Sequence, residues 1–437
     1  MEKEKAYIET WGCQLNYHRS EKIAGTLEDN GYAIVREIGE ADLIVFNTCA
    51  VRDKSEEKVR GRIGQIKDER KENSVLGVGG CMAQHLGEDL FDGPGGGVDF
   101  VFGTSNLSEI PELAEKARQT GPHASTPRPD GFENLPVLRK SSYFAWVTIA
   151  EGCSNACSYC IVPKVRGPLR SRSPERIISE IKGLKDEGYR EVQLLGQNVN
   201  AFGQDLEGED KDFAWLLDKV ARTEIPRVSF TTPHPKDLDK KTLVVMDEHE
   251  NVIRQLHLPL QSGSNRVLRI MNRGYTREEY LEKVEKARRM DPDINITTDI
   301  IVGHPGEMEE DFRQTLEVIE RVKFGSIYVA QFSPRPKTRS ATMEDHVTDK
   351  EKKRRLQIVL DKQKEYSRDR ESRFRGRTTE VLVQGLAREE GAVYGKDEFG
   401  RTVTFPGDED MIGEFKSITL KSANRGRPAE KTGANLK

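Results

Sequence analysis

Short apolar segments alternate with amphipathic, helix-like segments in two separate stretches of the chain, and this alternation restricts the fold more than any other feature. Between residues 1 and 120 the apolar segments are AYIET, ADLIVFN, SVLGVGG and VDFVFG. Between residues 143 and 347 they are FAWVTIA, EVQLL, RVSFT, QLHLPL, NITTDIIVG and SIYVAQF. Strands separated by helices form parallel sheets covered by helices. The sequence therefore predicts an α/β fold with two such units, the second an open, partial barrel of six strands.

The rest of the chain divides where the composition changes. Residues 121–142 are rich in Pro, Gly and Ser, which is typical of a linker. Residues 348–372 form one highly charged segment that predicts a long helix with a solvated face. Beyond residue 373 the segments TEVLVQGLA, AVYGKD, RTVTFPG and EFKSITLKS predict a small β-barrel. We expect four parts: residues 1–120, the linker 121–142, the partial barrel 143–372 and the β-barrel 373–437.

Composition restricts the location of the protein more than its chemistry. The 437 residues contain no apolar run long enough for a membrane helix, and the first residues, MEKEKAYIET, lack the core of a signal peptide. The net charge of −4 neither indicates nor excludes a nucleic-acid partner. We expect a cytoplasmic monomer without membrane contact, in which the six cysteines are not disulfides.

Three cysteines lie close together directly after the first strand of the predicted barrel. Cys153, Cys157 and Cys160, here called the tight triad, are spaced Cys-x3-Cys-x2-Cys. Three thiolates at this spacing can hold an iron–sulfur cube and leave one iron open. Zinc is the alternative for a short cysteine run, but it requires a fourth ligand, and none follows in IVPKVRGPLR. The open iron can be chelated by the amine and carboxylate of an amino acid.

The other three cysteines, Cys13, Cys49 and Cys81, are far apart in sequence and are here called the dispersed triad. Each follows one of the first three predicted strands, so we expect them to meet at one edge of the sheet. They lie in polar turns, WGCQLN, NTCAVRD and GGCMAQ, rather than in the apolar strands where buried core thiols are expected. Structural zinc with His18 or His85 and an iron–sulfur cluster both remain open from the spacing.

Polar residues also follow the strands of the predicted barrel, on the face that carries the tight triad. They are Gln197, Asn198, Thr232, His234, Gln261, Ser262 and Asp299. Each residue alone is as easily a helix cap as a ligand contact, and only the set as a whole indicates a ligand site. A basic cluster directly after the tight triad contains Lys164, Arg166, Arg170, Arg172 and Arg176. It is either ordinary surface charge or a contact for an anion such as RNA.

The tight triad resembles the cysteine motif of radical S-adenosylmethionine (SAM) enzymes, and the whole layout resembles the methylthiotransferase family. That family has an N-terminal domain with three dispersed cysteines, a radical-SAM partial barrel and a C-terminal TRAM β-barrel, and the likeness covers roughly residues 5–426. Several strings look like the MiaB branch, which modifies tRNA: LLGQNVNAFG, HLPLQSGSNRVLRIMNRGYTREEY, TTDIIVGHPGE and FPGDEDMIGEF. Three positions depart from the family pattern: His304 where Phe is usual, Lys337 where Gly is usual, and a blurred TRAM motif at residues 395–401.

The resemblance implies two [4Fe-4S] clusters and SAM as cofactors. It implies that a cluster on the tight triad cleaves SAM reductively to a 5′-deoxyadenosyl radical, which takes hydrogen from C2 of N6-isopentenyladenosine at position 37 of the tRNA anticodon loop. It implies that an auxiliary cluster on the dispersed triad supplies the sulfur, that a second SAM supplies the methyl group, and that an electron donor such as flavodoxin or ferredoxin is needed.

The resemblance also suggests roles for residues outside the triads. We expect cofactor contacts from Tyr159, Gln197, Asn198, Thr232, Gln261 and Asp299, and RNA contacts from Lys164, Arg166, Arg170 and Arg172. Some of these arginines could instead hold the SAM carboxylate. Two alternatives remain: a methylthiotransferase acting on threonylcarbamoyl-adenosine in tRNA or on a ribosomal protein, and a non-catalytic iron–sulfur or zinc protein that binds RNA.

Overall fold

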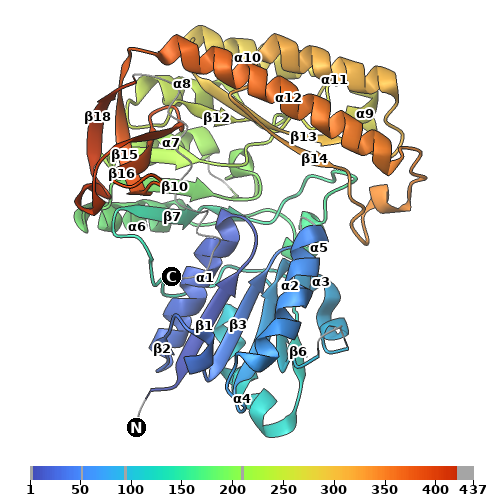
Figure 1. Cartoon of the computed structure of the whole chain (residues 1–437), viewed down its shortest axis with the longest axis vertical. Helices are drawn as coiled ribbons and strands as arrows, with labels where there is room; N and C mark the ends of the chain where they lie inside the picture. Colours follow the sequence, from blue (N-terminus) through green and yellow to red (C-terminus); the bar gives the residue numbers. More distant parts are fainter. Residues whose placement is uncertain (1–2, 51–52, 93–95, 208–210, 421–437) are drawn as a thin grey trace.

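The computed structural model describes residues 3–50, 53–92, 96–207 and 211–420. It shows an N-terminal sheet domain, a partial barrel beyond it and a small C-terminal sheet packed on the barrel (Figure 1). This is the predicted order of domains, and the α/β class is confirmed. Among the described residues, no helix combines the length and the apolar character needed to cross a membrane.

The N-terminal domain is a six-stranded parallel sheet in the order β2-β1-β3-β4-β5-β6. Its strands are β1 (Lys5–Thr10), β2 (Ala33–Ile34), β3 (Leu43–Thr48), β4 (Val75–Gly80), β5 (Phe100–Phe102) and β6 (His123–Ser125). Helices α1 (Gln14–Asp29) and α4 (Ile110–Thr120) cover one face, and α2 (Asp53–Gln65) and α3 (Cys81–Leu86) cover the other. Because β6 belongs to this sheet, the linker begins after residue 125 and not at residue 121 as predicted.

Glycines in β4 allow the sheet to pack closely. A Cβ atom on Gly77 would lie 2.1 Å from the Phe100 ring, and one on Gly79 would lie 2.0 Å from the Phe102 ring. Both phenylalanines are on the neighbouring strand and are fully buried. The glycine-rich sequence SVLGVGG is therefore a strand whose missing side chains make room for the two rings.

The barrel consists of two three-stranded parallel sheets, β11-β10-β7 and β12-β13-β14. Their strands are β7 (Phe144–Thr148), β10 (Glu191–Leu195), β11 (Arg227–Phe230), β12 (Gln255–His257), β13 (Asn295–Val302) and β14 (Ser326–Gln331). A single bridge between Val228 and Val252 lies at the junction of the two sheets. The predicted six strands are present, but their hydrogen bonding is interrupted between β11 and β12.

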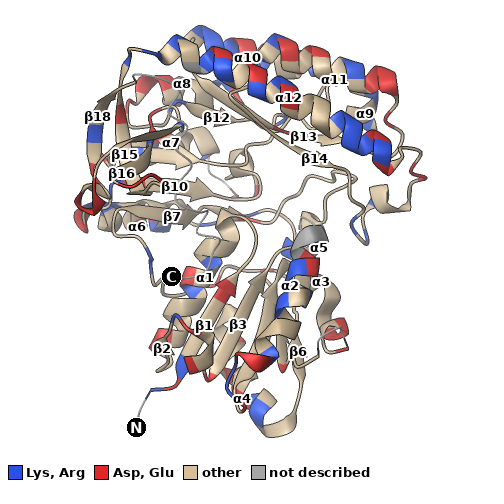
Figure 2. Ribbon diagram, in the orientation of Figure 1, with Lys and Arg blue, Asp and Glu red and all other residues tan. Residues whose placement is uncertain are grey.

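Helices cover the outside of the barrel and share one large apolar core with its strands. They are α6 (Pro174–Asp186), α7 (Phe213–Ala221), α8 (Lys240–Glu248), α9 (Asn265–Ile270), α10 (Arg277–Met290), α11 (Glu309–Val322) and α12 (Asp349–Phe374). Basic and acidic residues are interleaved along α12 (Figure 2), and many are paired within the helix, as Arg354 is with Glu351. The predicted solvated face of this helix is thus confirmed.

The C-terminal sheet is antiparallel, in the order β17-β16-β15-β18, and curls around a small apolar core. Its strands are β15 (Thr378–Leu386), β16 (Ala392–Asp397), β17 (Thr402–Pro406) and β18 (Phe415–Thr419). It is anchored to the barrel by hydrogen bonds from Arg227 to Lys396 O (2.7 Å) and from Tyr143 to Gln384 O (2.9 Å).

The linker between the two α/β domains is packed against helix α1. It passes so close to this helix that a Cβ on Gly25 would lie 2.5 Å from Pro136 O.

Candidate active site

The dispersed triad lies at one edge of the N-terminal sheet. Cys13 precedes α1, Cys49 follows β3 and Cys81 opens α3. β1, β3 and β4 are neighbours whose ends are in register, as Thr48 pairs with Gly80. The turns touch, since a Cβ on Gly12 would lie 2.8 Å from Cys49 Cβ. Cys49 and Cys81 are buried and Cys13 is exposed. The three cysteines thus follow neighbouring strands at one edge of the sheet, as expected, and a cluster held by all three stays a prediction.

A buried arginine from the barrel reaches the dispersed triad. Arg166 ends the short helix α5 (Val162–Arg166), is 3% exposed, and donates from Nε to Cys81 Sγ (3.2 Å) and from Nη2 to Asn16 Oδ1 (2.6 Å). Ile161 and Val165, on the same segment, form a small apolar cluster with Ala50 and Cys81. The segment that follows the tight triad therefore packs on Cys81 of the dispersed triad.

The tight triad lies in the loop between the short antiparallel strands β8 (Ala150–Glu151) and β9 (Arg170–Ser171). Cys153 N donates to Gly167 O and Cys160 N to Cys157 O, both at 3.1 Å. Gly152 has a φ of +76°, and a Cβ there would lie 1.9 Å from Pro168 O, so only glycine fits this turn. The backbone of the loop is thus held tightly around the three cysteines.

A second buried arginine contacts the tight triad. Arg273 is 4% exposed and donates from Nη1 to Cys157 Sγ and Tyr159 Oη, both at 3.2 Å. Burial raises the pKa of Cys160 to about 12, so this thiol is protonated until a metal displaces the proton. Both cysteine sets therefore combine soft donors with a buried cation, which fits iron–sulfur ligation. Among the described residues, no three His, Cys, Asp or Glu side chains are arranged to hold a single metal ion.

The residues expected to contact the cofactor lie at the strand ends of the barrel. Gln197 Oε1 and Gln261 Oε1 are buried without a hydrogen-bond partner among the described residues. Gln261 and Thr232 have left-handed φ angles of 68° and 60°, a strain that clusters at functional sites. These side chains retain acceptor capacity toward a ligand.

Asn198 and Asp299 make internal contacts. Asn198 donates to Asp237 Oδ2 (2.6 Å) and accepts from His234 N, so its amide is used inside the protein. Asp299 lies 3.0 Å from His257 Nε2 and keeps 40% of its side chain exposed. The pair of His257 and Asp299 was not recognised in the sequence, because the two residues come from different strands.

The expected basic surface after the tight triad is only partly present. Lys164 is exposed. Arg166 is buried at Cys81, Arg170 donates to Pro129 O (3.1 Å), and Arg172 pairs with Glu180 (2.5 Å). The prediction of an RNA contact is therefore wrong for Arg166, which docking of the two domains buries. Arg170 and Arg172 are partly exposed and held by partners in the linker and the barrel, and RNA contacts from them stay a prediction.

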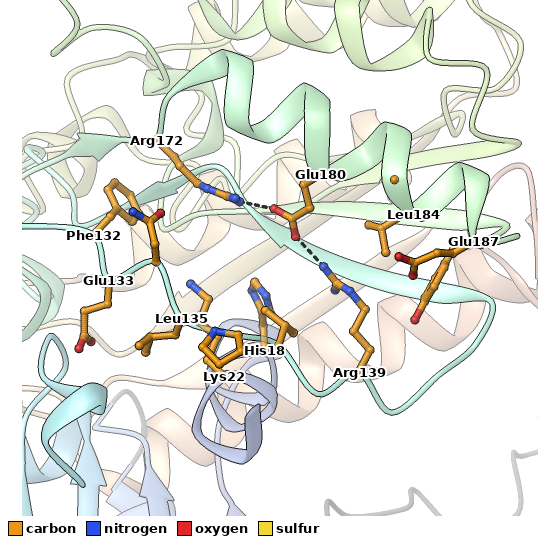
Figure 3. Close-up of a pocket in the computed structure, with 15 residues that line it drawn as sticks. His18, Lys22, Phe132, Glu133, Leu135, Arg139, Arg172, Glu180, Leu184 and Glu187 are labelled. Atoms are coloured by element: carbon orange, nitrogen blue, oxygen red, sulfur yellow. Dashed lines mark hydrogen bonds and ion pairs between the residues drawn. The ribbon is translucent and has the colours of Figure 1, made fainter. Parts of the chain in front are cut away.

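A cleft of about 660 Å³ lies between α1, the linker and α6, and its lining includes His18, Lys22, Arg139, Arg172 and Glu180. The side chains of Arg139 and Arg172 approach Glu180 from opposite sides (Figure 3). His18 Nδ1 lies 2.7 Å from Thr148 Oγ1 in the barrel, so His18 joins the two domains and is not directed at Cys13 as the zinc hypothesis required.

Family models match three parts of the chain. A Radical SAM superfamily model matches residues 147–319, a model of the Uncharacterized protein family UPF0004 matches residues 5–103, and a TRAM domain model matches residues 372–427. A tRNA-2-methylthio-N(6)-dimethylallyladenosine synthase from a Thermoanaerobacter species is 43% identical over 95% of this chain and 89% of its own length. The synthase of the same name from Clostridium botulinum is 42% identical over 96% and 94%.

This chain belongs to the family of these tRNA-2-methylthio-N(6)-dimethylallyladenosine synthases. The expected relationship to radical-SAM methylthiotransferases is thereby confirmed, and with it the expectation of an enzyme that uses a [4Fe-4S] cluster and SAM.

Solved structures support the fold. The radical SAM methyltransferase TsrM from Kitasatospora setae has a TM-score of 0.56 at 14% identity, covering 78% of this chain and 74% of its own. The cobalamin-dependent SAM radical enzyme OxsB has a TM-score of 0.54 at 11% identity, covering 84% of this chain and 56% of its own.

Proposed function

We propose that this protein is a tRNA methylthiotransferase that adds a methylthio group to C2 of N6-isopentenyladenosine next to the anticodon, by radical SAM chemistry. One observation carries the proposal furthest: Arg166 extends from the segment behind the tight triad to Cys81 of the dispersed triad. This contact supports a single continuous site that contains both cysteine sets. The names of the relatives agree with this reaction.

Clusters bound at the two triads would supply reductive cleavage of SAM at one and sulfur at the other. The chain itself holds and orients the reactants. Cys153, Cys157 and Cys160 would bind one cluster, and the buried oxygens of Gln197 and Gln261 are acceptors suited to the ammonium group of SAM. The Tyr159 hydroxyl accepts a hydrogen bond from Arg273, which fixes its ring beside the tight triad.

RNA recognition is assigned to exposed groups only. Lys164 remains in the proposal, whereas the buried Arg166 does not, and RNA contacts from Arg170 and Arg172, which pair with Glu151 and Glu180, remain predictions. The TRAM match covers the curled C-terminal sheet, which offers a second surface for RNA. Phosphate contacts of this kind weaken steeply as salt rises. A flavodoxin or ferredoxin as electron donor, a monomeric state and a cytoplasmic location remain predictions.

The test is anaerobic reconstitution with iron and sulfide, followed by turnover with SAM, a strong reductant and tRNA carrying N6-isopentenyladenosine. We expect about eight irons per chain, as for two four-iron clusters, together with 5′-deoxyadenosine and the 2-methylthio nucleoside by mass analysis. Deoxyadenosine without that nucleoside would overturn the substrate, and parallel reactions with threonylcarbamoyl-adenosine tRNA and with ribosomal protein then identify the alternative. Absence of deoxyadenosine would favour a non-catalytic protein.

A further inference from the structure

One of the three guanidinium nitrogens of Arg166 has no hydrogen-bond acceptor among the described residues. Its Nε and Nη2 are taken by Cys81 and Asn16. Its Nη1 is buried and has no partner among the described residues. An unpaired donor of a buried guanidinium costs free energy, so such groups are normally satisfied by water or a ligand. The free donor belongs to a guanidinium that already contacts the dispersed triad.

The positive charge around the dispersed triad is also in excess. Arg19 and Arg166 are 4% and 3% exposed, and the buried Glu151 carboxylate accepts from Arg19 Nη1 at 3.0 Å, whereas Arg166 has no carboxylate as a hydrogen-bond partner in the part of the chain that the structure describes. Arg170 Nη2 lies 3.7 Å from the other oxygen of the same carboxylate. Buried cations without an equal number of anions call for an anionic ligand. Three thiolates and an anion on the open iron would provide this charge.

Arg273 at the tight triad provides a contrast. Its Nε donates to Tyr275 Oη and its Nη2 to Pro259 O, while Nη1 contacts Cys157 and Tyr159. Every nitrogen of this guanidinium therefore has a partner in the protein. At each triad a buried arginine donates to one cysteine sulfur, but of these two arginines only Arg166 has an unpaired N–H donor among the described residues.

We propose that Arg166 is a positioning residue for the sulfur-supplying site: it donates to the Cys81 thiolate and, through Nη1, to the anionic sulfur ligand on the open iron. The proposal rests on the proposed function, because it assumes a cluster on the dispersed triad. N–H···S bonds and a nearby cation stabilise the more negative, reduced state and hold an anionic ligand. Arg166 thus raises the reduction potential of that cluster and tightens binding of the sulfur ligand.

The experiment reads the auxiliary cluster alone. Full-length protein with Cys153, Cys157 and Cys160 replaced by Ala is reconstituted anaerobically, and Arg166→Gln, Arg166→Lys and the matched control Arg222→Gln are made in this background. Arg222 is exposed on the barrel and pairs with Asp218 on its own helix. Iron content, the midpoint potential by EPR-monitored titration and the affinity for methanethiolate are measured.

We expect about four irons per chain in the background and in the control. Arg166→Gln should lower the reduction equilibrium constant at least tenfold, which is about 59 mV for one electron, and weaken methanethiolate binding at least tenfold. Arg166→Lys, which keeps the charge, should lie between Arg166→Gln and the control in both measurements. A purely structural role would instead appear as loss of iron from the variants.

Each of the other possible results contradicts either the proposed function or the role of Arg166. A background protein without iron overturns the auxiliary cluster, and so both the proposed function and this inference. A cluster whose potential and affinity in Arg166→Gln equal those of the control overturns the inference alone. If Arg166→Gln loses its iron, Arg166→Lys is read against the control in its place. Loss of iron from both variants would make Arg166 purely structural and would also overturn the inference.

Discussion

The buried pair of Arg19 and Glu151 joins the N-terminal domain to the barrel, and its removal should be costly. Arg19 lies on α1 and Glu151 on β8, with side chains 4% and 8% exposed and a distance of 3.0 Å between Arg19 Nη1 and Glu151 Oε1. Breaking a buried pair by removing one partner costs about 3–5 kcal/mol when the remaining charge stays desolvated and unpaired. Glu151 keeps Arg170 Nη2 at 3.7 Å, so we expect Arg19→Leu to lower the free energy of unfolding by the lower end of this range, about 3 kcal/mol.

The assay is urea unfolding of the cluster-free protein, with Arg222→Leu as the control. Arg222 forms an exposed pair with Asp218, so its loss should cost no more than about 1 kcal/mol. The double variant Arg19→Leu/Glu151→Leu removes both buried charges and should be more stable than Arg19→Leu alone. Equal unfolding free energies for Arg19→Leu and Arg222→Leu would refute the reasoning, as would a double variant that loses the sum of the two single losses.

Three further predictions follow from other parts of the structure. Cys157→Ala should abolish 5′-deoxyadenosine formation, whereas Cys49→Ala should retain it and lose methylthio transfer; equal loss of cleavage in both would contradict the division of roles. Gly79→Ala places a Cβ 2.0 Å from a buried ring on β5 and should cost about 1–3 kcal/mol in thermal unfolding. Gly61→Ala, in open space on α2, should cost nothing, and equal effects would count against the packing argument. Burial raises the pKa of Glu21 to about 7, so the folded state binds this proton more tightly than the unfolded state and stability falls as pH rises from about 4.5 to 7. Glu21→Gln should therefore gain up to about 3 kcal/mol at pH 8 and little at pH 4, and a gain independent of pH would contradict this assignment.

The local pattern of the sequence was sufficient for the strands and for the dispersed triad. Cysteines after successive parallel strands meet at one edge, because such strands point the same way. The break between β11 and β12 was not predictable, since a single bridge such as that from Val228 to Val252 leaves no periodicity in the sequence. The strand β6 was not predicted either, because its three residues are too few to show an alternation of apolar and polar side chains, and they were assigned to the linker.

The contacts of Arg166 and Arg273 with the cysteines could not be predicted from the sequence. Arg166 follows the tight triad on a five-residue helix, too short for an amphipathic pattern, so its inward direction is set only by docking of the two domains. Arg273 is 116 residues away from the cysteine that it contacts. A long-range partner of this kind can be found only once the chain is folded.

Helix α1 has a consequence for how a substrate gains access. It has 16 residues, about 24 Å of rigid rod. Cys13 precedes its first residue, His18 contacts the barrel, and Gly25 supports the linker. A single stiff element therefore ties the turn that carries Cys13 to the barrel strand β7 that His18 contacts. Under the proposed function, the RNA has to deform, because the target base must leave its stack to reach a site held between two joined domains.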